Sequence, residues 1–193
     1  MTTLALGIMF VWALANPTGA FQAAPAARGP ETFKVTATVL PRDGNASGAI
    51  TVPITIQIDG YNPPSARTKM LDGLKYGGYP GFLLALRQTP TAGTLVVAGE
   101  RYAIRWAREE PAEAGRRITL VTDAPIHFVG GARKGAKSTS GYEVAVVLLN
   151  VNAAGSGDGT MAAAARVKPK DVTGVQVDDY AETPIKLTVA GGK

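Results

Sequence analysis

Short segments of alternating apolar and polar residues run through most of this chain, and they constrain its fold more than any other feature. Successive side chains of a β-strand point to opposite faces of a sheet, so this alternation is typical of a strand with one buried face. Residues 33–39, for example, place Lys34, Thr36 and Thr38 between apolar side chains. Strand patterns predict strands at residues 33–40, 49–59, 94–98, 101–107, 117–122, 142–150, 160–168, 175–178 and 185–189, and residues 142–150, the most apolar run, are expected to be a central strand.

One segment departs from this pattern and predicts helices. Apolar side chains in residues 65–88 recur at helical spacing, Ser65 is a suitable N-cap, and Pro80 suits the first turn of a second helix. Gly77 and Gly78 lie between the two helical stretches and end the first of them. We therefore expect a two-helix insert near residues 65–88.

The connections between the expected strands are mostly short, which favours antiparallel hairpins over parallel crossovers. The chain has no cysteine, so its stability depends on a hydrophobic core, and 46% of its residues are hydrophobic. The sequence thus predicts a mostly β (α+β) fold: an antiparallel sandwich or partly closed barrel of about 8–9 strands. No linker or repeat divides residues 31–193, which we expect to form a single β-rich domain.

The N-terminal segment has the character of an export signal. Leu4–Ala15 is an uncharged apolar run, shorter than the roughly 20 residues that a membrane-spanning helix needs. Small residues then offer cleavage after Ala20 or Ala26, which predicts a signal peptide over residues 1–20 and a flexible leader over 21–30. We expect a periplasmic or secreted protein with no transmembrane span in the mature chain; retention of the segment as an N-terminal anchor is the alternative.

Charge and motifs weigh against several classes of partner. The net charge of +5 comes from basic residues spread along the chain, usually near an acid, so we expect no nucleic-acid partner. Gly157–Ala162 matches the G-x-G-x-x-A dinucleotide pattern, but Pro169 would end a following helix within about two turns. We expect no cofactor, and no metal site either, since the chain has no cysteine and a single histidine.

That histidine is the one candidate for acid–base chemistry. His127 follows Asp123 by four residues, and a serine-type triad needs one histidine with a carboxylate beside it. No G-x-S-x-G or S-x-x-K motif supplies a matching nucleophile. His127 and Asp123 are therefore fallback catalytic residues, and a strand histidine with backbone hydrogen bonds is the plainer interpretation.

Aromatic residues suggest a place for a ligand. Tyr76, Tyr79 and Phe82 lie at the glycine-rich bend of the helical insert, and alternate spacing puts Tyr102 and Trp106 on one strand face. Inserts of this kind often cap a barrel end or a sheet face, where pockets form. We expect a small, mainly apolar pocket between the two groups of rings; simple packing of the rings against one another is the alternative.

Four stretches also support a family resemblance: Gly78–Leu83, Tyr102–Arg108, Gly115–Pro125 and Asp178–Leu187. Together they resemble an uncharacterised group of exported bacterial proteins, over most of residues 50–190. The resemblance implies export and a single β-rich domain, and it assigns no activity, cofactor or catalytic residue.

These observations favour a non-catalytic exported envelope protein that binds a small apolar ligand or another envelope component. An exported hydrolase that uses His127 and Asp123 is one alternative. A structural scaffold protein is the other.

Overall fold

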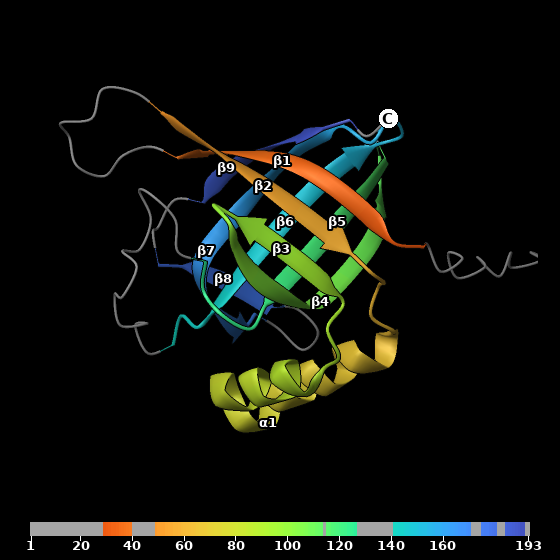
Figure 1. Ribbon diagram of the computed structural model, residues 1–193. Helices are drawn as coiled ribbons and strands as arrows, with labels where there is room; N and C mark the ends of the chain where they lie inside the picture. Colours follow the sequence, from red (N-terminus) through yellow and green to blue (C-terminus); the bar gives the residue numbers. More distant parts are fainter. Residues whose placement is uncertain are drawn as a thin grey trace, which may run out of the picture.

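Eight antiparallel strands close into a barrel, and one helix packs on its outside (Figure 1). The computed structural model describes residues 29–39, 49–113, 115–126, 141–170, 175–180 and 184–191. The elements in chain order are β1 (Glu31–Val39), β2 (Ile50–Ile58), α1 (Pro64–Gln88), β3 (Gly93–Val97), β4 (Glu100–Ala112), β5 (Gly115–Thr122), β6 (Val144–Asn152), β7 (Gly157–Pro169), β8 (Val175–Asp179) and β9 (Ile185–Ala190). The expected signal peptide, both cleavage sites and residues 21–28 of the expected leader lie outside the described residues.

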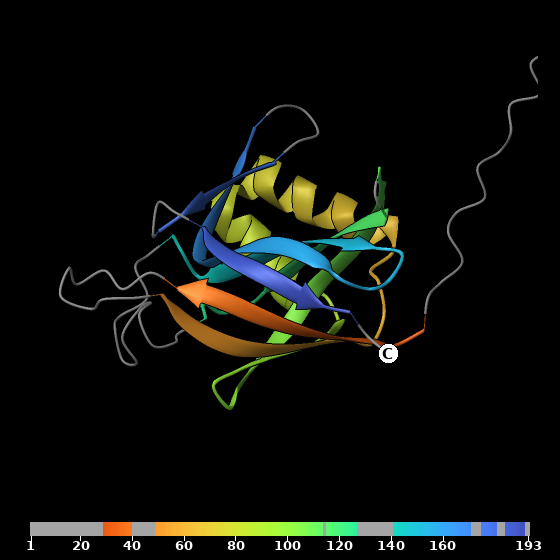
Figure 2. The ribbon, with the colours of Figure 1, turned by 90° about the horizontal axis from the view of Figure 1, so that it is seen from above.

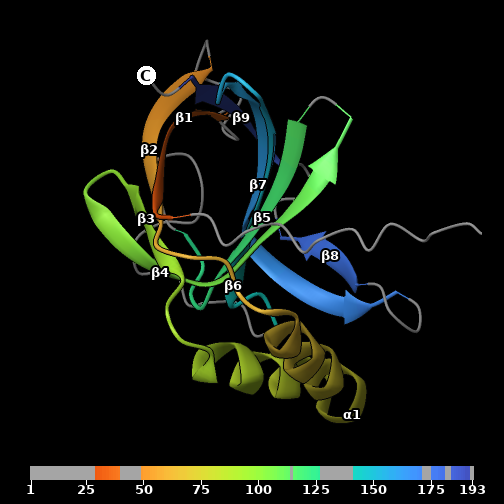
Figure 3. The ribbon, with the colours of Figure 1, turned by 90° about the vertical axis from the view of Figure 1, so that its right-hand side faces the viewer.

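The barrel runs β1-β2-β3-β4-β5-β6-β7-β9 and is closed by the pairing of β9 with β1. The expected mostly β, antiparallel fold is therefore confirmed; of the two predicted forms it is the barrel, and its closure is complete. Strand β7 is long enough to serve two partners on one edge. Its residues 157–161 pair with β9, and its residues 165–169 pair with β8. Figure 3 shows β8 diverging from the barrel on the side where α1 lies.

Apolar side chains fill the barrel interior, as the alternating strand sequences dictate. Ile54, Ile56 and Ile58 of β2 point inward and are at most 2% exposed, and every other strand of the barrel contributes inward residues to the same cluster. An eight-stranded barrel has an interior just wide enough for side chains to fill. On β1 and β2 the outward positions are mostly threonine, with a lysine, a proline and a glutamine.

Where α1 covers the barrel, the outer face is apolar instead. Helix residues Met70, Leu74 and Leu86 pack with Val144 and Ala165 of β6 and β7 in a second buried cluster. Seen from above, α1 lies across the barrel beneath its strands (Figure 2). No helix in the described part of the chain has both the length and the apolar character to cross a membrane.

Helix α1 is one element bent into two arms, so the predicted two-helix insert is matched in part. The bend is at Gly78, whose φ of 61° and ψ of −156° lie outside the helical region and suit glycine. The arms approach so closely at Gly73 and Gly81 that a Cβ on Gly81 would lie 2.3 Å from the Gly73 carbonyl oxygen. Ser65 is not the N-cap as predicted: the helix begins after Pro63, without a side-chain cap.

A β-bulge in β4 corrects one prediction about the candidate site. Ile104 pairs with Thr122 and Trp106 with Val121, so Arg105 is an extra residue without a partner on β5. The bulge turns Trp106 outward, into the cluster beneath α1, whereas Tyr102 points into the barrel. The expectation that Tyr102 and Trp106 share a face is wrong, because strict alternation ends at Arg105.

Candidate functional site: an apolar cleft between α1 and the barrel

A cleft of about 230 Å³ lies between α1 and the outer face of the barrel. Its floor is a row of side chains in cross-strand register, in which Val121 of β5 pairs with Trp106 of β4 on one side and with Val146 of β6 on the other. All three are at most 8% exposed. The bulge in β4 is what brings the indole of Trp106 into this row.

The roof of the cleft comes from both arms of α1. Met70 and Leu71 line it from the first arm, and Phe82 lines it from the second. The bend at Gly78 sets the position of the two arms, and the close contact of Gly73 with Gly81 holds them together. The roof therefore depends on the geometry of the helical bend as well as on the side chains.

Strand β8 forms the side wall at one end. Val175 and Val177 line the cleft and remain 44% and 39% exposed, respectively. Val177 pairs with Val167 of β7, which also lines the cleft. Because β8 pairs with β7 alone among the described strands, this apolar end opens at a free sheet edge.

The opposite end of the cleft is polar. Arg108 follows Trp106 by two residues on the same outward face of β4 and lies opposite Thr119 of β5. A guanidinium nitrogen of Arg108 lies 2.7 Å from Glu110 Oε1, and Arg67 of α1 also lines the cleft. The cleft thus has Arg108, Glu110 and Thr119 at this end and the valines of β8 at the other.

The five predicted pocket residues separate in the structure. Phe82 and Trp106 both line the cleft. Tyr76 is 78% exposed, with the Lys75 ammonium 5.2 Å from the centre of its ring. Tyr102 lies inside the barrel, where its hydroxyl donates a hydrogen bond of 3.0 Å to Glu100.

Tyr79 anchors the bend of α1 instead of lining the cleft. Its hydroxyl donates to the Ala165 carbonyl at 3.3 Å and accepts from the Glu143 backbone N–H at 3.0 Å. Its ring stacks on Phe82 with the ring centres 6.1 Å apart. Burial raises the pKa of the Tyr79 phenol above its ordinary value, so the hydroxyl stays protonated and can donate its hydrogen bond to the Ala165 carbonyl.

The fallback catalytic pair does not form a described site. His127 lies outside the described residues. Asp123 accepts a hydrogen bond of 2.7 Å from Arg105 Nε, and Arg105 also donates to Thr91 Oγ1 at 3.1 Å. The carboxylate of Asp123 therefore holds the bulge residue of β4 to the end of β5.

A separate polar cluster closes one end of the barrel. Arg116 of β5 donates to Glu31 of β1 and to Glu109 of β4, the latter at 2.8 Å, and to the Tyr61 hydroxyl at 3.3 Å. The hydrogen bonds that Arg116 donates to Glu31 raise the pKa of Arg116, and burial raises the pKa of Tyr61. Since the guanidinium is committed to protein partners, we assign this cluster a structural role.

A larger hollow of about 800 Å³ lies where both ends of α1 meet the barrel. Its lining combines Asp59, Lys69, Asp72 and Gln88 with loop residues, and the described residues there include no cluster of large aliphatic side chains. It does not suit an apolar ligand. Within the described ranges, no group of three or more histidine, aspartate or glutamate residues is arranged to hold a metal ion.

Sequence reasoning missed the contributions of Arg67, Arg108, Val175 and Val177 to the cleft. The alternation of Val175 and Val177 with polar residues predicts a strand face, but the sequence does not show that this face meets α1. No family model, curated protein or solved structure matches this chain.

Proposed function

We propose that the chain is an exported, non-catalytic binding protein that takes a small apolar ligand in the cleft between α1 and the barrel. One observation carries the proposal: Phe82 and Trp106, singled out from the sequence as pocket residues, line a cleft whose floor and roof are otherwise valine, leucine and methionine. Ligand sites in proteins are typically concave, mostly apolar and edged by a few polar groups.

The dimensions favour a slender ligand. Pockets for drug-sized ligands measure about 300–1,000 Å³, and this cleft, at about 230 Å³, is smaller. It has room for one alkyl chain or one small ring system. Each buried methylene group contributes about 0.8 kcal/mol, so even a short chain gains a useful affinity there.

The groups at the polar end suit binding better than catalysis. Arginine stays protonated in proteins and does not act as a general base. Among the described residues, Glu110 is the one carboxylate that lines the cleft, and it is paired with Arg108. The hydrolase alternative rests on Asp123, which is bound to Arg105 on β4.

Intrinsic fluorescence tests the proposal directly. The chain has two tryptophans, so a Trp12→Phe background leaves Trp106 as the reporter. We expect decanol, short-chain quinones or aromatic acids to change the emission of Trp106 saturably. A Val177→Phe variant, which fills the cleft from β8, should weaken the response at least fivefold, whereas Val96→Phe on the outer face of β3 should leave it unchanged.

An unchanged emission across the whole panel, with the protein shown to be folded by circular dichroism, would rule out this function and favour the scaffold role.

Export is tested separately by intact mass. We expect the protein recovered from outside the cytoplasm to begin after Ala20 or Ala26. Recovery of the full-length chain from the cytosol would contradict the export proposal. It would not affect the proposal that the cleft binds a ligand.

A further inference from the structure

We propose that two copies of this chain associate through the free edge of β8, as antiparallel strands with Gln176 of one copy opposite Gln176 of the other. The inference goes beyond the proposed function, because ligand binding in the cleft does not require a second copy. It starts from the position of β8 in the sheet. Among the described strands β8 alone has a single partner, β7, and it diverges from the barrel (Figure 3).

The pairing with β7 shows which backbone groups of β8 are already used. The backbone N–H of Tyr180, just after β8, donates to the Ala164 carbonyl at 2.9 Å. In an antiparallel pair, every second residue exchanges hydrogen bonds with the residue opposite it. Counting back from Tyr180 in the β7–β8 register, Asp178 and Gln176 are therefore the residues whose backbone groups bond to β7.

The alternate residues present their backbone outward. The N–H and C=O groups of Val175 and Val177 point away from β7, toward the free edge. Pro169 of β7 lies opposite Val175, which agrees with this assignment, because proline has no N–H and the ladder needs none at that pair. An open edge is a template for a further strand, and natural edges often carry lysine or proline that prevent such pairing. The sequence of β8, VQVDD, has neither.

This edge is complementary to itself. A two-fold axis through Gln176, perpendicular to the sheet, places Val175 opposite Val177 of the second copy, and Val177 opposite its Val175. Each valine then donates to the valine opposite and accepts from it, so the outward backbone groups of both valines are satisfied. A contact of this kind uses the same patch on both copies and closes after two, as in the commonest class of protein oligomer.

The side chains suit the same register. Val175 and Val177 share the face that lines the open end of the cleft, and they are 44% and 39% exposed. The pairing sets each of them beside a valine of the second copy, which extends the apolar wall of both clefts. On the other face the neutral Gln176 meets itself, and Asp178 lies beyond the paired residues. No like charges are therefore opposed, and a direct opposition of like charges is what destabilises a strand pair.

Sedimentation equilibrium tests the association. Because only residues 175–177 take part, the interface is smaller than the roughly 1,200 Å² of stable complexes, and we expect a weak dimer. The mean mass of the purified protein should rise from that of a monomer toward that of a dimer between about 10 μM and about 1 mM.

A charge exchange at the axis tests the register. Gln176→Lys sets two ammonium groups opposite each other, and Gln176→Glu sets two carboxylates there, so each variant alone should weaken the dimer about fivefold. An equimolar mixture of the two variants should restore association to within about twofold of the unchanged protein, because opposite charges then meet. Gln57→Lys and Gln57→Glu are the controls, at an exposed position of β2, which has a strand partner on each side. They should not change association, alone or mixed.

A proline tests the backbone bonds. Val177→Pro removes an outward N–H and no bond to β7, and proline is accepted at an edge where the N–H faces solvent. We expect it to weaken the dimer about tenfold or more, since one hydrogen bond is lost from each copy. Val177→Thr keeps the N–H and nearly the same shape, and should change the dimer less than about threefold. Circular dichroism checks that each variant is folded.

The outcomes also separate this inference from the proposed function. A folded protein that stays monomeric throughout overturns it, and so does a dimer that Val177→Pro leaves intact or that the mixed Gln176 variants fail to restore. If the chain is monomeric and Val177→Pro changes only the response of Trp106 to decanol, β8 is a wall of the cleft and no more. A Gln176→Lys protein that is monomeric and still responds to decanol supports both proposals independently.

Discussion

The two faces of the same barrel hold two apolar clusters that differ in how completely they close. Inside the barrel, Ile56, Leu95 and Leu120 are fully buried by other strands. On the outside, Leu71, Val175 and Val177 line a cleft that α1 covers only in part. Eight strands can close on one another around a filled interior, whereas a bent helix cannot follow the curved outer face throughout. We infer that stability is concentrated in the interior and binding beneath the helix.

The largest expected effect comes from the same substitution made in the two clusters. Leu120→Ala removes a fully buried side chain from the barrel and should lower the free energy of unfolding by about 3–4 kcal/mol. Leu71→Ala removes a partly exposed side chain that lines the cleft, and should cost about 1 kcal/mol or less because no closed cavity is created. Urea denaturation followed by circular dichroism measures both. Equal losses would mean that the cleft is packed as tightly as the barrel.

The next effect concerns the polar cluster at the barrel end. Arg116→Met leaves Glu31 and Glu109 facing each other without the guanidinium that now binds both. The Arg116 side chain is 16% exposed, so we expect a loss of about 2–4 kcal/mol, somewhat below that for a fully buried pair. Arg101→Met on the exposed face of β4 is the control and should change the free energy of unfolding by less than about 0.5 kcal/mol. A loss as small as that of the control would show that the cluster is loosely held.

A smaller effect distinguishes the two arms of α1. Gly81→Ala places a Cβ 2.3 Å from the Gly73 carbonyl oxygen, which forces the arms apart and should cost about 1–3 kcal/mol. Gly77→Ala meets no atom within 4 Å and should be neutral or stabilising by up to about 1 kcal/mol. Thermal unfolding measures both, and Trp106 fluorescence reports whether the roof of the cleft has moved. Similar effects of the two variants would contradict the close crossing of the arms.

How much of the structure the sequence predicts differs between the inside of the barrel and its outer face. Most of the nine strands were predicted from alternation, because inward residues such as Val35 and Ile56 recur at every second position, and β6 was predicted from its continuous apolar run. These patterns did not predict closure, which depends on β1 pairing with β9 from the far end of the chain. Residues 108–116, which lie between two of the predicted strands, are mostly strand, because β4 and β5 continue as a long hairpin past the barrel end.

The site was less predictable than the fold. The bulge at Arg105 reverses the direction of Trp106, and no residue type at that position signals it. Phe82, at the helical bend, lines the cleft, whereas the neighbouring Tyr79 uses its hydroxyl to fix that bend to β7 and to Glu143 just before β6. The cleft is lined by side chains of both α1 and β8, which lie about a hundred residues apart in the chain, and local patterns do not encode such an arrangement.

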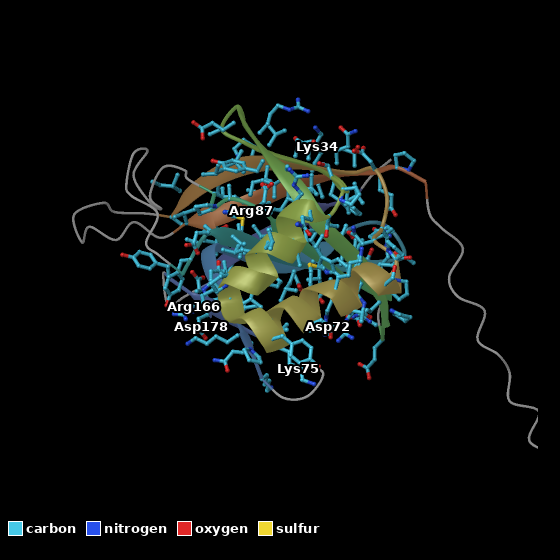
Figure 4. The ribbon with its side chains drawn as sticks, turned by 90° about the horizontal axis from the view of Figure 1, so that it is seen from below. Lys34, Asp72, Lys75, Arg87, Arg166 and Asp178 are labelled. Carbon is cyan, nitrogen blue, oxygen red and sulfur yellow. The ribbon has the colours of Figure 1, made fainter. Side chains whose placement is uncertain are left out.

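The smallest expected effect tests how β8, the open wall of the cleft, is held. The Asp178 carboxylate is hydrogen-bonded by the Lys168 ammonium of β7 and by the Gln176 amide at 3.0 Å, and these contacts, Lys168 first, lower its pKa below the ordinary value. Figure 4 shows Asp178 beside Arg166 at one edge of the face that α1 covers, and the two residues are paired in the β7–β8 register. A lowered pKa means that the contribution to stability is fully present above the ordinary aspartate pKa. It is lost as the pH falls through the lower value in the folded protein.

We therefore expect an NMR titration of the Asp178 carboxyl to give a pKa below that of an unfolded control, and Lys168→Gln to move it back toward the ordinary value. Lys170→Gln, an exposed charge just past the end of β7, should leave the Asp178 pKa nearly unchanged.

Because Lys168 is 48% exposed, the effect of Lys168→Gln on global unfolding should be slight. The local effect should be larger, since β8 has one strand partner among the described elements: amide exchange at Asp178 should quicken in Lys168→Gln while that at Ile56 stays the same. Equal exchange at Asp178 in both proteins would mean that β8 is held by its backbone pairing with β7 and by packing on α1. The β8 wall of the cleft would then resist local opening as well as the barrel strands do.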